Sequence, residues 1–446
     1  MMNWSKTTKK LRAFLLFLSG LLLAGSWAIR GMMNGYNPVL KVSSQRYDAQ
    51  IVKHTKSGDP YPIYKSGPYN TSSSTQTGIS NGKRYVGDYV RVMQTKITKT
   101  GIYAKLRYFN RYIGWMNISG LKPVTVSQIA SQMMKQYDVS GSALIASAGS
   151  RNIAVVSNGF ANAAKKIANS SGGAVLYPLA SLQKVMTGAI IQQLIENGDL
   201  SATTSLNRYY PQIKGSQNIT IGQLLSMTSG IDNEDITPDR AMTEKQAYAD
   251  IVKRLNSTGK QGYLYSDANY VLLAGIIAKV TGQSYTKNLQ DRIINRLGMN
   301  STEIVNAQKV DANSIAISYF RDGLKDYTNP QSVSLPRLSS IPGAGNLLTT
   351  PSDYYKLILG LQDGTILTAQ QYQELLSYGS VYSGGMYVSK KGVAYSNGSF
   401  DGQGFHSGYL ATTDNYHLAI VFENQPPLNL GAKKFVEKMY EIATYY

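Results

Sequence analysis

Predicted strands at both ends of residues 126–446 flank a helix-rich middle, and this arrangement constrains the fold more than any other feature of the chain. A helix is predicted at 124–137, followed by strands at 141–147 and 152–158. Helices are predicted at 270–280 and 291–297, strands at 408–412 and 417–423, and a last helix at 432–445. Because strands from both ends must pair to bury their apolar faces, we expect an α+β fold. It would have one antiparallel sheet flanked by helices, plus a helical subdomain.

Residues 31–125 are predicted to form a separate all-β domain. Short β-branched and aromatic runs at 85–92, 100–106 and 111–116 alternate with Gly and Asn, and 66–82 is predicted to be a long polar loop. This segment holds fourteen Lys and Arg against three Asp, which is most of the formal net charge of +19. On an exported protein such a surface would meet teichoic acid, lipoteichoic acid or acidic lipids rather than nucleic acid. A generic basic surface without a specific partner is the alternative.

Residues 1–30 have the pattern of a targeting segment. Four basic residues precede an uncharged, leucine-rich stretch at 13–29: Lys6, Lys9, Lys10 and Arg12. A cleaved signal peptide and an uncleaved membrane anchor both fit, and a buried core helix is the third interpretation. The positive end should stay in the cytoplasm, so we expect the rest of the chain to be exported.

The chain has no cysteine and only three histidines. Disulfides, a lipoprotein cysteine anchor, thiolate metal sites and a cysteine nucleophile are therefore excluded. So few histidines also argue against a histidine-rich metal centre, and we expect neither a metal nor a cofactor. Export without cysteine favours a Gram-positive envelope.

Ser181 and Lys184 head the apolar run 185–194 and lie one helical turn apart on the same face. A serine hydroxyl becomes a good nucleophile only when a neighbouring group takes its proton, and a buried lysine can do so. This spacing therefore predicts a serine acyl-transfer enzyme. Four further matches must be accidental if this one is real: Ser80/Lys83, Ser119/Lys122, Ser257/Lys260 and Ser284/Lys287.

Two further motifs follow the Ser181 pair in a fixed order. Tyr265-Ser266-Asp267 comes 84 residues after Ser181, and His406-Ser407-Gly408 comes 141 residues after Tyr265. In this order the chain resembles the serine β-lactamase and penicillin-binding superfamily. The likeness is to its group of class C β-lactamases, D-alanyl-D-alanine carboxypeptidases and esterases. The resemblance spans 126–446 and implies a β-lactamase/transpeptidase-like fold for a serine hydrolase domain.

The resemblance also implies a role for each catalytic candidate. Ser181 would form the acyl-enzyme, and Lys184 in its neutral form would take or relay the serine proton. Tyr265 would act as base when it is a phenolate and would protonate the leaving group when it is a phenol. His406 stands where many relatives have a lysine, and it would donate a hydrogen bond to the substrate or attract its carboxylate.

The substrate-binding candidates are Asp267, Ser407, Gly408 and Tyr409. The resemblance implies an oxyanion hole made by the backbone N–H groups of Ser181 and Tyr409. Ser407 and Gly408 would let the substrate backbone approach the strand closely. Asp267 departs from the family pattern, which usually has asparagine there, because an ionised aspartate cannot donate to a substrate amide carbonyl.

Two envelope substrates compete at this point. One is the D-Ala-D-Ala end of a peptidoglycan peptide, and the other is a D-alanyl ester on teichoic acid. The basic module and Asp267 favour the ester slightly. The same motifs also fit a β-lactamase, or a non-catalytic wall-binding or sensor protein that keeps the fold.

A second resemblance lies in the basic segment. Tyr112-Ile113-Gly114-Trp115, followed by Leu121-Lys122-Pro123, is similar to the bacterial SH3-like modules with a Gly-Trp dipeptide that tether surface proteins to teichoic acid. The resemblance implies an SH3-like barrel, with Trp115 and Tyr112 as candidate wall-binding residues. Aromatic residues in a small barrel are also common in the core, so a packing role is the alternative.

Overall fold

The computed structural model describes residues 37–52, 61–69, 79–80, 82–147, 152–260, 262–307, 310–389, 391–400 and 404–446. The predicted leader at 1–30 lies outside the described residues. Within the described part of the chain, no helix is long and apolar enough to cross a membrane. The chain divides into two compact units, one of residues 1–129 with 445–446 and the other of residues 130–444.

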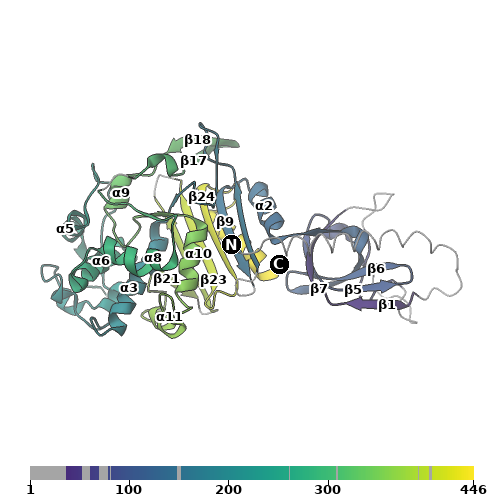
Figure 1. The fold of residues 1–446 in the computed structure, drawn as a ribbon, viewed down its shortest axis with the longest axis horizontal. Helices are drawn as coiled ribbons and strands as arrows, with labels where there is room; N and C mark the ends of the chain where they lie inside the picture. Colours follow the sequence, from purple (N-terminus) through teal and green to yellow (C-terminus); the bar gives the residue numbers. More distant parts are fainter. Residues whose placement is uncertain are drawn as a thin grey trace. The chain divides into compact units, whose positions relative to one another are not determined.

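The described residues of the first unit form β-strands up to Val124, as predicted, with two short 3-10 turns, and these strands pair antiparallel (Figure 1). Seven strands follow the order β4-β3-β7-β6-β5-β2-β8, and β1 also pairs with β5. Their bounds are β1 Val39–Ser43, β2 Tyr47–Ile51, β3 Ile63–Tyr64, β4 Ile79–Ser80, β5 Tyr89–Thr98, β6 Gly101–Tyr108, β7 Arg111–Asn117 and β8 Leu121–Val124. Asp48 and Arg91 face each other across β2 and β5, with Nε 2.9 Å from Oδ1, so an ion pair reinforces their register.

The two aromatic candidates of this unit differ in exposure. Trp115 on β7 is only 5% exposed, whereas Tyr112 on the same strand is 60% exposed. Lys96 Nζ lies 4.7 Å from the Trp115 ring centroid, and Lys105 Nζ lies 4.5 Å from the Tyr112 ring centroid. Trp115 is therefore a packed residue, and of the two aromatic side chains Tyr112 is the one that presents its ring to solvent.

The second unit contains a seven-stranded antiparallel sheet built from both ends of the domain, as predicted. Its order is β10-β9-β24-β23-β22-β21-β20. The strands are β9 Ser140–Ser147, β10 Asn152–Asn158, β20 Tyr382–Ser383, β21 Met386–Ser389, β22 Val393–Ser399, β23 His406–Thr412 and β24 Leu418–Gln425. Sequence analysis did not predict β20 to β22, because their Ser, Asn and Gly residues are typical of turns.

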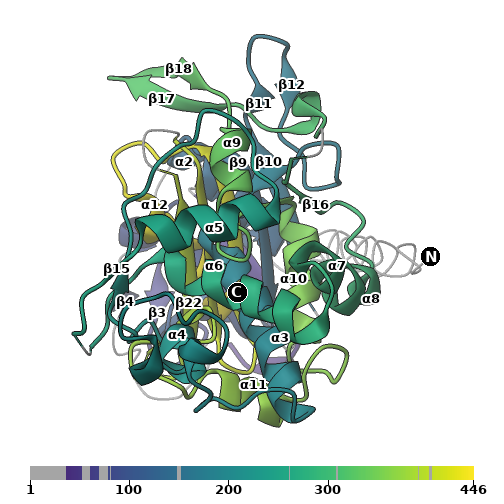
Figure 2. The same ribbon diagram turned by 90° about the vertical axis from the view of Figure 1, so that its left-hand side faces the viewer.

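Helices of the middle segment pack together beside this sheet (Figure 2). The long apolar helix α6 (Asp267–Thr281) ends at Gly282, whose φ of 69° suits a glycine C-cap. Around α6 pack α3 (Lys184–Glu196), α4 (Ile221–Leu225) and α5 (Glu244–Arg254). The final helix, α12 (Ala432–Tyr445), covers the sheet where Val436 meets Gly408 of β23. The helical subdomain therefore fixes α3 and α6 against each other, and both helices carry predicted site residues.

Gly188 on α3 lies directly against the turn between β20 and β21. A Cβ added there would stand 2.4 Å from the Gly384 carbonyl oxygen. We expect Gly188→Ala to lower the free energy of unfolding by about 1–3 kcal/mol in denaturant titrations, although alanine has the higher helix propensity. Gly431→Ala is the control, because an added Cβ there meets nothing within 4 Å. Equal stability of the two variants would show that this close approach is not needed.

Candidate active site

Ser181 lies on a short 3-10 turn, η4 (Ala180–Gln183), that continues directly into α3. Ala180 has a φ of 48°, in the left-handed region that residues with a Cβ seldom adopt. Backbone strain of this kind costs of the order of 1–3 kcal/mol and is concentrated at functional sites. The turn leaves Ser181 partly exposed, while Lys184 is completely buried.

Two side chains hold the Ser181 hydroxyl. Lys184 Nζ donates to Ser181 Oγ at 3.0 Å, and the Tyr265 hydroxyl donates to the same oxygen at 2.7 Å. Lys184 Nζ also donates to the Ala344 carbonyl oxygen at 2.7 Å, which fixes the direction of the amine. Both groups are thus within reach to exchange a proton with the serine. The structure therefore brings Ser181, Lys184 and Tyr265 together at the predicted site.

Asp267, at the start of α6, is the counter-ion of the buried lysine, with Oδ1 2.8 Å from Lys184 Nζ. Burial alone would lower the pKa of the Lys184 ammonium, but Asp267 and Tyr265 outweigh it and hold the pKa above its ordinary value. Burial also raises the pKa of the Tyr265 phenol, and Lys184 offsets only part of this rise. The resting site therefore contains an ammonium, a carboxylate and a neutral phenol.

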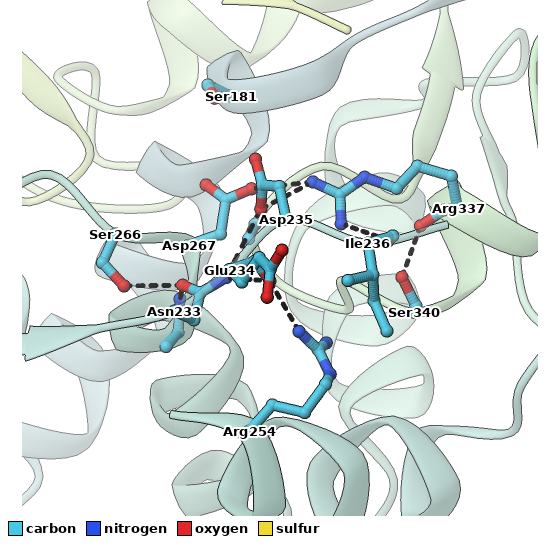
Figure 3. Close-up of polar contacts among 12 residues, drawn as sticks. Ser181, Asn233, Glu234, Asp235, Ile236, Arg254, Ser266, Asp267, Arg337 and Ser340 are labelled. Atoms are coloured by element: carbon cyan, nitrogen blue, oxygen red, sulfur yellow. Dashed lines mark hydrogen bonds and ion pairs between the residues drawn. The ribbon is translucent and has the colours of Figure 1, made fainter. Parts of the chain in front are cut away.

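A second charged pair, which sequence analysis missed, lies beside Asp267 (Figure 3). Arg337 is 8% exposed and binds Asp235, with a guanidinium nitrogen 2.8 Å from Oδ1. The same nitrogen is 4.0 Å from Asp267 Oδ2, and the other terminal nitrogen donates to the Ile236 carbonyl oxygen at 3.0 Å. One carboxylate thus faces a lysine and an arginine together. Arg337 and Asp235 belong to no recognisable sequence motif, so their place beside the active site becomes apparent only in the folded structure.

These residues line a cavity of ≈ 1160 Å³. Ser181, Tyr265, Asp267, Asp235 and Arg337 all contribute to its wall, so the hydroxyl and both carboxylates face one space. Among the described residues, no group of three or more His, Cys, Asp or Glu is placed to hold a metal ion. The arrangement can bind a charged substrate and transfer its acyl group to Ser181.

His406 is not placed as the sequence predicts. It opens β23, on the face that α12 covers, with Nε2 3.2 Å from Asn397 Oδ1 and Nδ1 3.7 Å from Glu423 Oε2. Burial, together with nearby Lys433, lowers the pKa of His406 to about 4. Burial also raises the pKa of the Glu423 carboxyl well above its ordinary value. A neutral, buried imidazole cannot attract a substrate carboxylate, and His406 is not among the residues that line the cavity. Donation of a hydrogen bond to the substrate stays a prediction.

The strand that reaches the nucleophile is β22. A Cβ added at Gly398 would stand 2.9 Å from Ser181 N and 2.8 Å from Ala180 Cβ, so only glycine fits this contact. Sequence analysis assigned the strand beside the nucleophile to His406-Ser407-Gly408 instead. A signal was available in Ser396-Asn397-Gly398, which also ends in glycine within a strand that alternates buried and half-buried residues.

The remaining candidates belong to β23, one strand further from the sheet edge. Ser407 Oγ donates to the Pro178 carbonyl oxygen at 2.7 Å, and Gly408 pairs with Asn397 of β22. Tyr409 lines the cavity, but its hydroxyl donates to Asn415 Oδ1 at 2.8 Å. Ser407 and Gly408 therefore contact other residues of the protein where substrate contacts were predicted.

A serine whose hydroxyl is held by lysine and tyrosine, at the junction of a helical subdomain and an antiparallel sheet, defines a serine hydrolase. The chain belongs to the Beta-lactamase family, whose model matches residues 126–433. Residues 41–122 match the model of the GW (Gly-Tryp) dipeptide domain. Both matches agree with the resemblances found in the sequence.

Individual relatives extend this assignment. The chain is 30% identical over 289 residues to the penicillin-binding protein PbpX of Bacillus subtilis, covering 62% of this chain and 68% of that protein. It is 27% identical over 244 residues to the teichoic acid D-alanine hydrolase of Staphylococcus aureus, covering 52% of this chain and 58% of that protein. The crystal structure of FmtA from Staphylococcus aureus matches with a TM-score of 0.61 and 22% identity. This match covers 72% of this chain and 90% of that one, and it shows the shared fold.

The Lys184–Asp267 pair sets the expected pH dependence. Lys184 can accept the serine proton only as a neutral amine, and the negative charge of Asp267 favours the ammonium. Asp267→Asn should therefore lower the pKa of Lys184 and move the acidic limb of the kcat/KM profile to lower pH by about one unit or more. Glu234→Gln, which removes a carboxylate from the neighbouring loop, is the control. An acidic limb that stays in place or moves to higher pH would contradict this electrostatic assignment.

Proposed function

We propose that this chain is an exported envelope esterase that removes D-alanyl groups from teichoic acid through an acyl-enzyme on Ser181. The observation that carries the proposal is the Ser181 hydroxyl held by Lys184 and Tyr265 in a cavity whose wall bears Asp267 and Asp235. A D-alanyl ester keeps a free α-ammonium group, which carboxylates attract. A D-Ala-D-Ala peptide instead ends in a carboxylate, which they repel. The similarity to the teichoic acid D-alanine hydrolase supports the same substrate.

The proposed reaction has two halves. In the first, Ser181 Oγ attacks the ester carbonyl carbon, and neutral Lys184 accepts the serine proton. The Ser181 N–H stabilises the oxyanion, and Tyr265 gives its proton to the departing alcohol oxygen as the ester bond breaks. The proton on Lys184 then restores the phenol. In the second half, water attacks the D-alanyl-serine ester with the same groups acting in reverse, and D-alanine leaves.

A D-alanyl-D-alanine carboxypeptidase is the second candidate. The similarity to PbpX, a penicillin-binding protein by name, favours it. Arg337 is the cavity cation beside Asp267 and could meet a terminal carboxylate, but Asp235 already binds it at 2.8 Å. The two candidates are separated by which compound releases D-alanine.

We expect the wild-type protein to release D-alanine from D-alanylated teichoic acid faster than from a stem pentapeptide. Ser181→Ala should lower the rate by about 10³-fold or more, because the covalent step is lost. Ser257→Ala is a matched control, since Ser257 belongs to another Ser-x-x-Lys match but lies on β15 (Asn256–Ser257), outside the cavity lining. Faster release from the pentapeptide would favour the carboxypeptidase. Full activity of Ser181→Ala would show that Ser181 is not the nucleophile.

We further propose that the basic first unit holds the enzyme on wall polyanions, with Tyr112 and its neighbouring lysine at the contact. Lys105 lies over the exposed Tyr112 ring, and Arg111 on β7 is exposed beside it. The match to the GW dipeptide domain supports a role for this unit as a module of its own. Export and attachment at the cell surface follow from this proposal together with the predicted leader.

Binding of the full chain to purified teichoic acid should weaken as salt rises, because the Debye length falls from about 30 Å at 0.01 M to about 8 Å at 0.15 M. The double variant Lys105→Ala/Arg111→Ala should bind more weakly and with a smaller salt dependence. Lys245→Ala/Lys287→Ala removes the same charge from the second unit and serves as the control. Equal loss in both double variants, or binding independent of salt, would exclude the electrostatic tether.

A further inference from the structure

The cavity does not end at Ser181 but continues along one face of β22. Side chains alternate along a strand, and Val393, Tyr395, Asn397 and Ser399 all line the cavity. Intervening Gly398 contacts the nucleophile turn instead. The seven residues of β22 are separated by steps of about 3.3 Å, so the strand spans roughly 20 Å from its first residue to its last. The cavity is therefore an elongated groove, and one end of its floor lies beside Ser181.

Helix α12 forms one side of this groove. Lys433, Val436, Glu437 and Tyr440 recur every three or four residues and all line the cavity, as one helical face should. Lys433 lies near the Ser181 end of the groove, because its charge helps to lower the pKa of His406, and His406 is paired with Ser399. Lys391 lies at the opposite end, just before β22 begins. The two lysines thus stand at the two ends of the strand.

Between the lysines the groove is aromatic. Tyr387 of β21 pairs with Tyr395 of β22, and their rings stack 4.9 Å apart with an interplanar angle of 11°. The Tyr263 hydroxyl is 2.7 Å from the Tyr387 hydroxyl and fixes that ring. Such a pair offers a flat apolar surface with hydroxyls at its rim, which suits the carbon skeleton of a polyol or a sugar.

In the described part of the chain, two acidic residues of the groove have ion-pair partners, whereas two of its lysines do not. Glu437 is paired with Lys434 at 2.7 Å, and Asp235 is paired with Arg337. Lys391 and Lys433, by contrast, have no ion pair within the described residues. Neutral His406 adds no charge beneath Lys433. Two uncompensated cations therefore lie at the two ends of a strand that is roughly 20 Å long, with an aromatic surface between them.

We propose that this groove binds the chain of an anionic phosphodiester polymer that carries the scissile D-alanyl group. Lys391 and Lys433 would contact phosphates, and the Tyr387–Tyr395 pair would contact the polyol or sugar between them. This inference rests on the proposed function and deepens it: it assigns a subsite to the leaving group rather than to the D-alanyl group. A peptide strand is the competing occupant, and competition for labelling of Ser181 separates the two.

The test measures how fast a fluorophosphonate labels Ser181, with and without undecorated poly(glycerol phosphate). In the wild-type chain the polymer should slow labelling by occupying the groove next to the nucleophile. In Lys391→Ala/Lys433→Ala about tenfold more polymer should be needed for the same slowing, since each lost cation weakens binding to phosphate. Lys245→Ala/Lys438→Ala removes equal charge outside the cavity lining and should behave as wild type. Polymer bound only to the first unit would not slow labelling.

Two outcomes would overturn the proposal. One is a wild-type labelling rate that the polymer leaves unchanged, and the other is slowing by a stem pentapeptide but not by the polymer. Hydrolysis of D-alanyl-glycerol, which lacks phosphate, tests the proposed function separately. If the enzyme hydrolyses D-alanyl-glycerol but the polymer does not protect Ser181 from labelling, the groove proposal is wrong and the esterase proposal stands. If the polymer protects Ser181 but the enzyme does not hydrolyse D-alanyl-glycerol, the groove proposal stands and the esterase proposal is wrong.

Discussion

The burial of a single ammonium group, that of Lys184, organises the second unit. A buried charge is tolerated only with partners, and removing one partner of a buried pair costs about 3–5 kcal/mol. Lys184 Nζ has three: Asp267 at 2.8 Å, the Ala344 carbonyl oxygen at 2.7 Å and Ser181 Oγ at 3.0 Å. Ser181 belongs to the same turn as Lys184, whereas Asp267 and Ala344 come from segments far away in the sequence. Folding the helical subdomain correctly and assembling the active site are therefore the same event.

In the resting enzyme Lys184 is an ammonium, although it must be a neutral amine to accept the proton of Ser181. Asp267 and Tyr265 hold the proton on Lys184, and Arg337 approaches the other oxygen of Asp267 at 4.0 Å. A cation in that position offsets part of the negative charge of Asp267, so Asp267 stabilises the Lys184 ammonium less strongly. Asp267 and Arg337 therefore influence the basicity of Lys184 without touching the serine.

Sequence patterns predicted the parts of this protein that depend on local spacing. The Ser181 and Lys184 pair and the strands from both ends follow from short periodicities, and the Tyr265 motif follows from the family resemblance. The structure brings Ser181, Lys184 and Tyr265 together. The long-range parts were not predictable in this way. His406 and Gly398 both belong to strands with a plausible glycine motif, and only the pairing order of the sheet decides which strand meets the nucleophile. Arg337 and Asp235 come from loop and short-helix positions without any periodic signal.

The glycine contact at the end of β22 links sheet register to chemistry. Gly398 touches the Ser181 backbone because no Cβ stands between them, and each register step moves a different residue into that position. A slip of one residue would turn the opposite face of the strand toward the serine, and a slip of two would bring Ser396 there. Turnover would then report the alignment of β22 and β23 at single-residue resolution. A kinetic assay could therefore serve as a folding probe for this part of the sheet, whose signal bulk spectroscopy averages with that of the other strands.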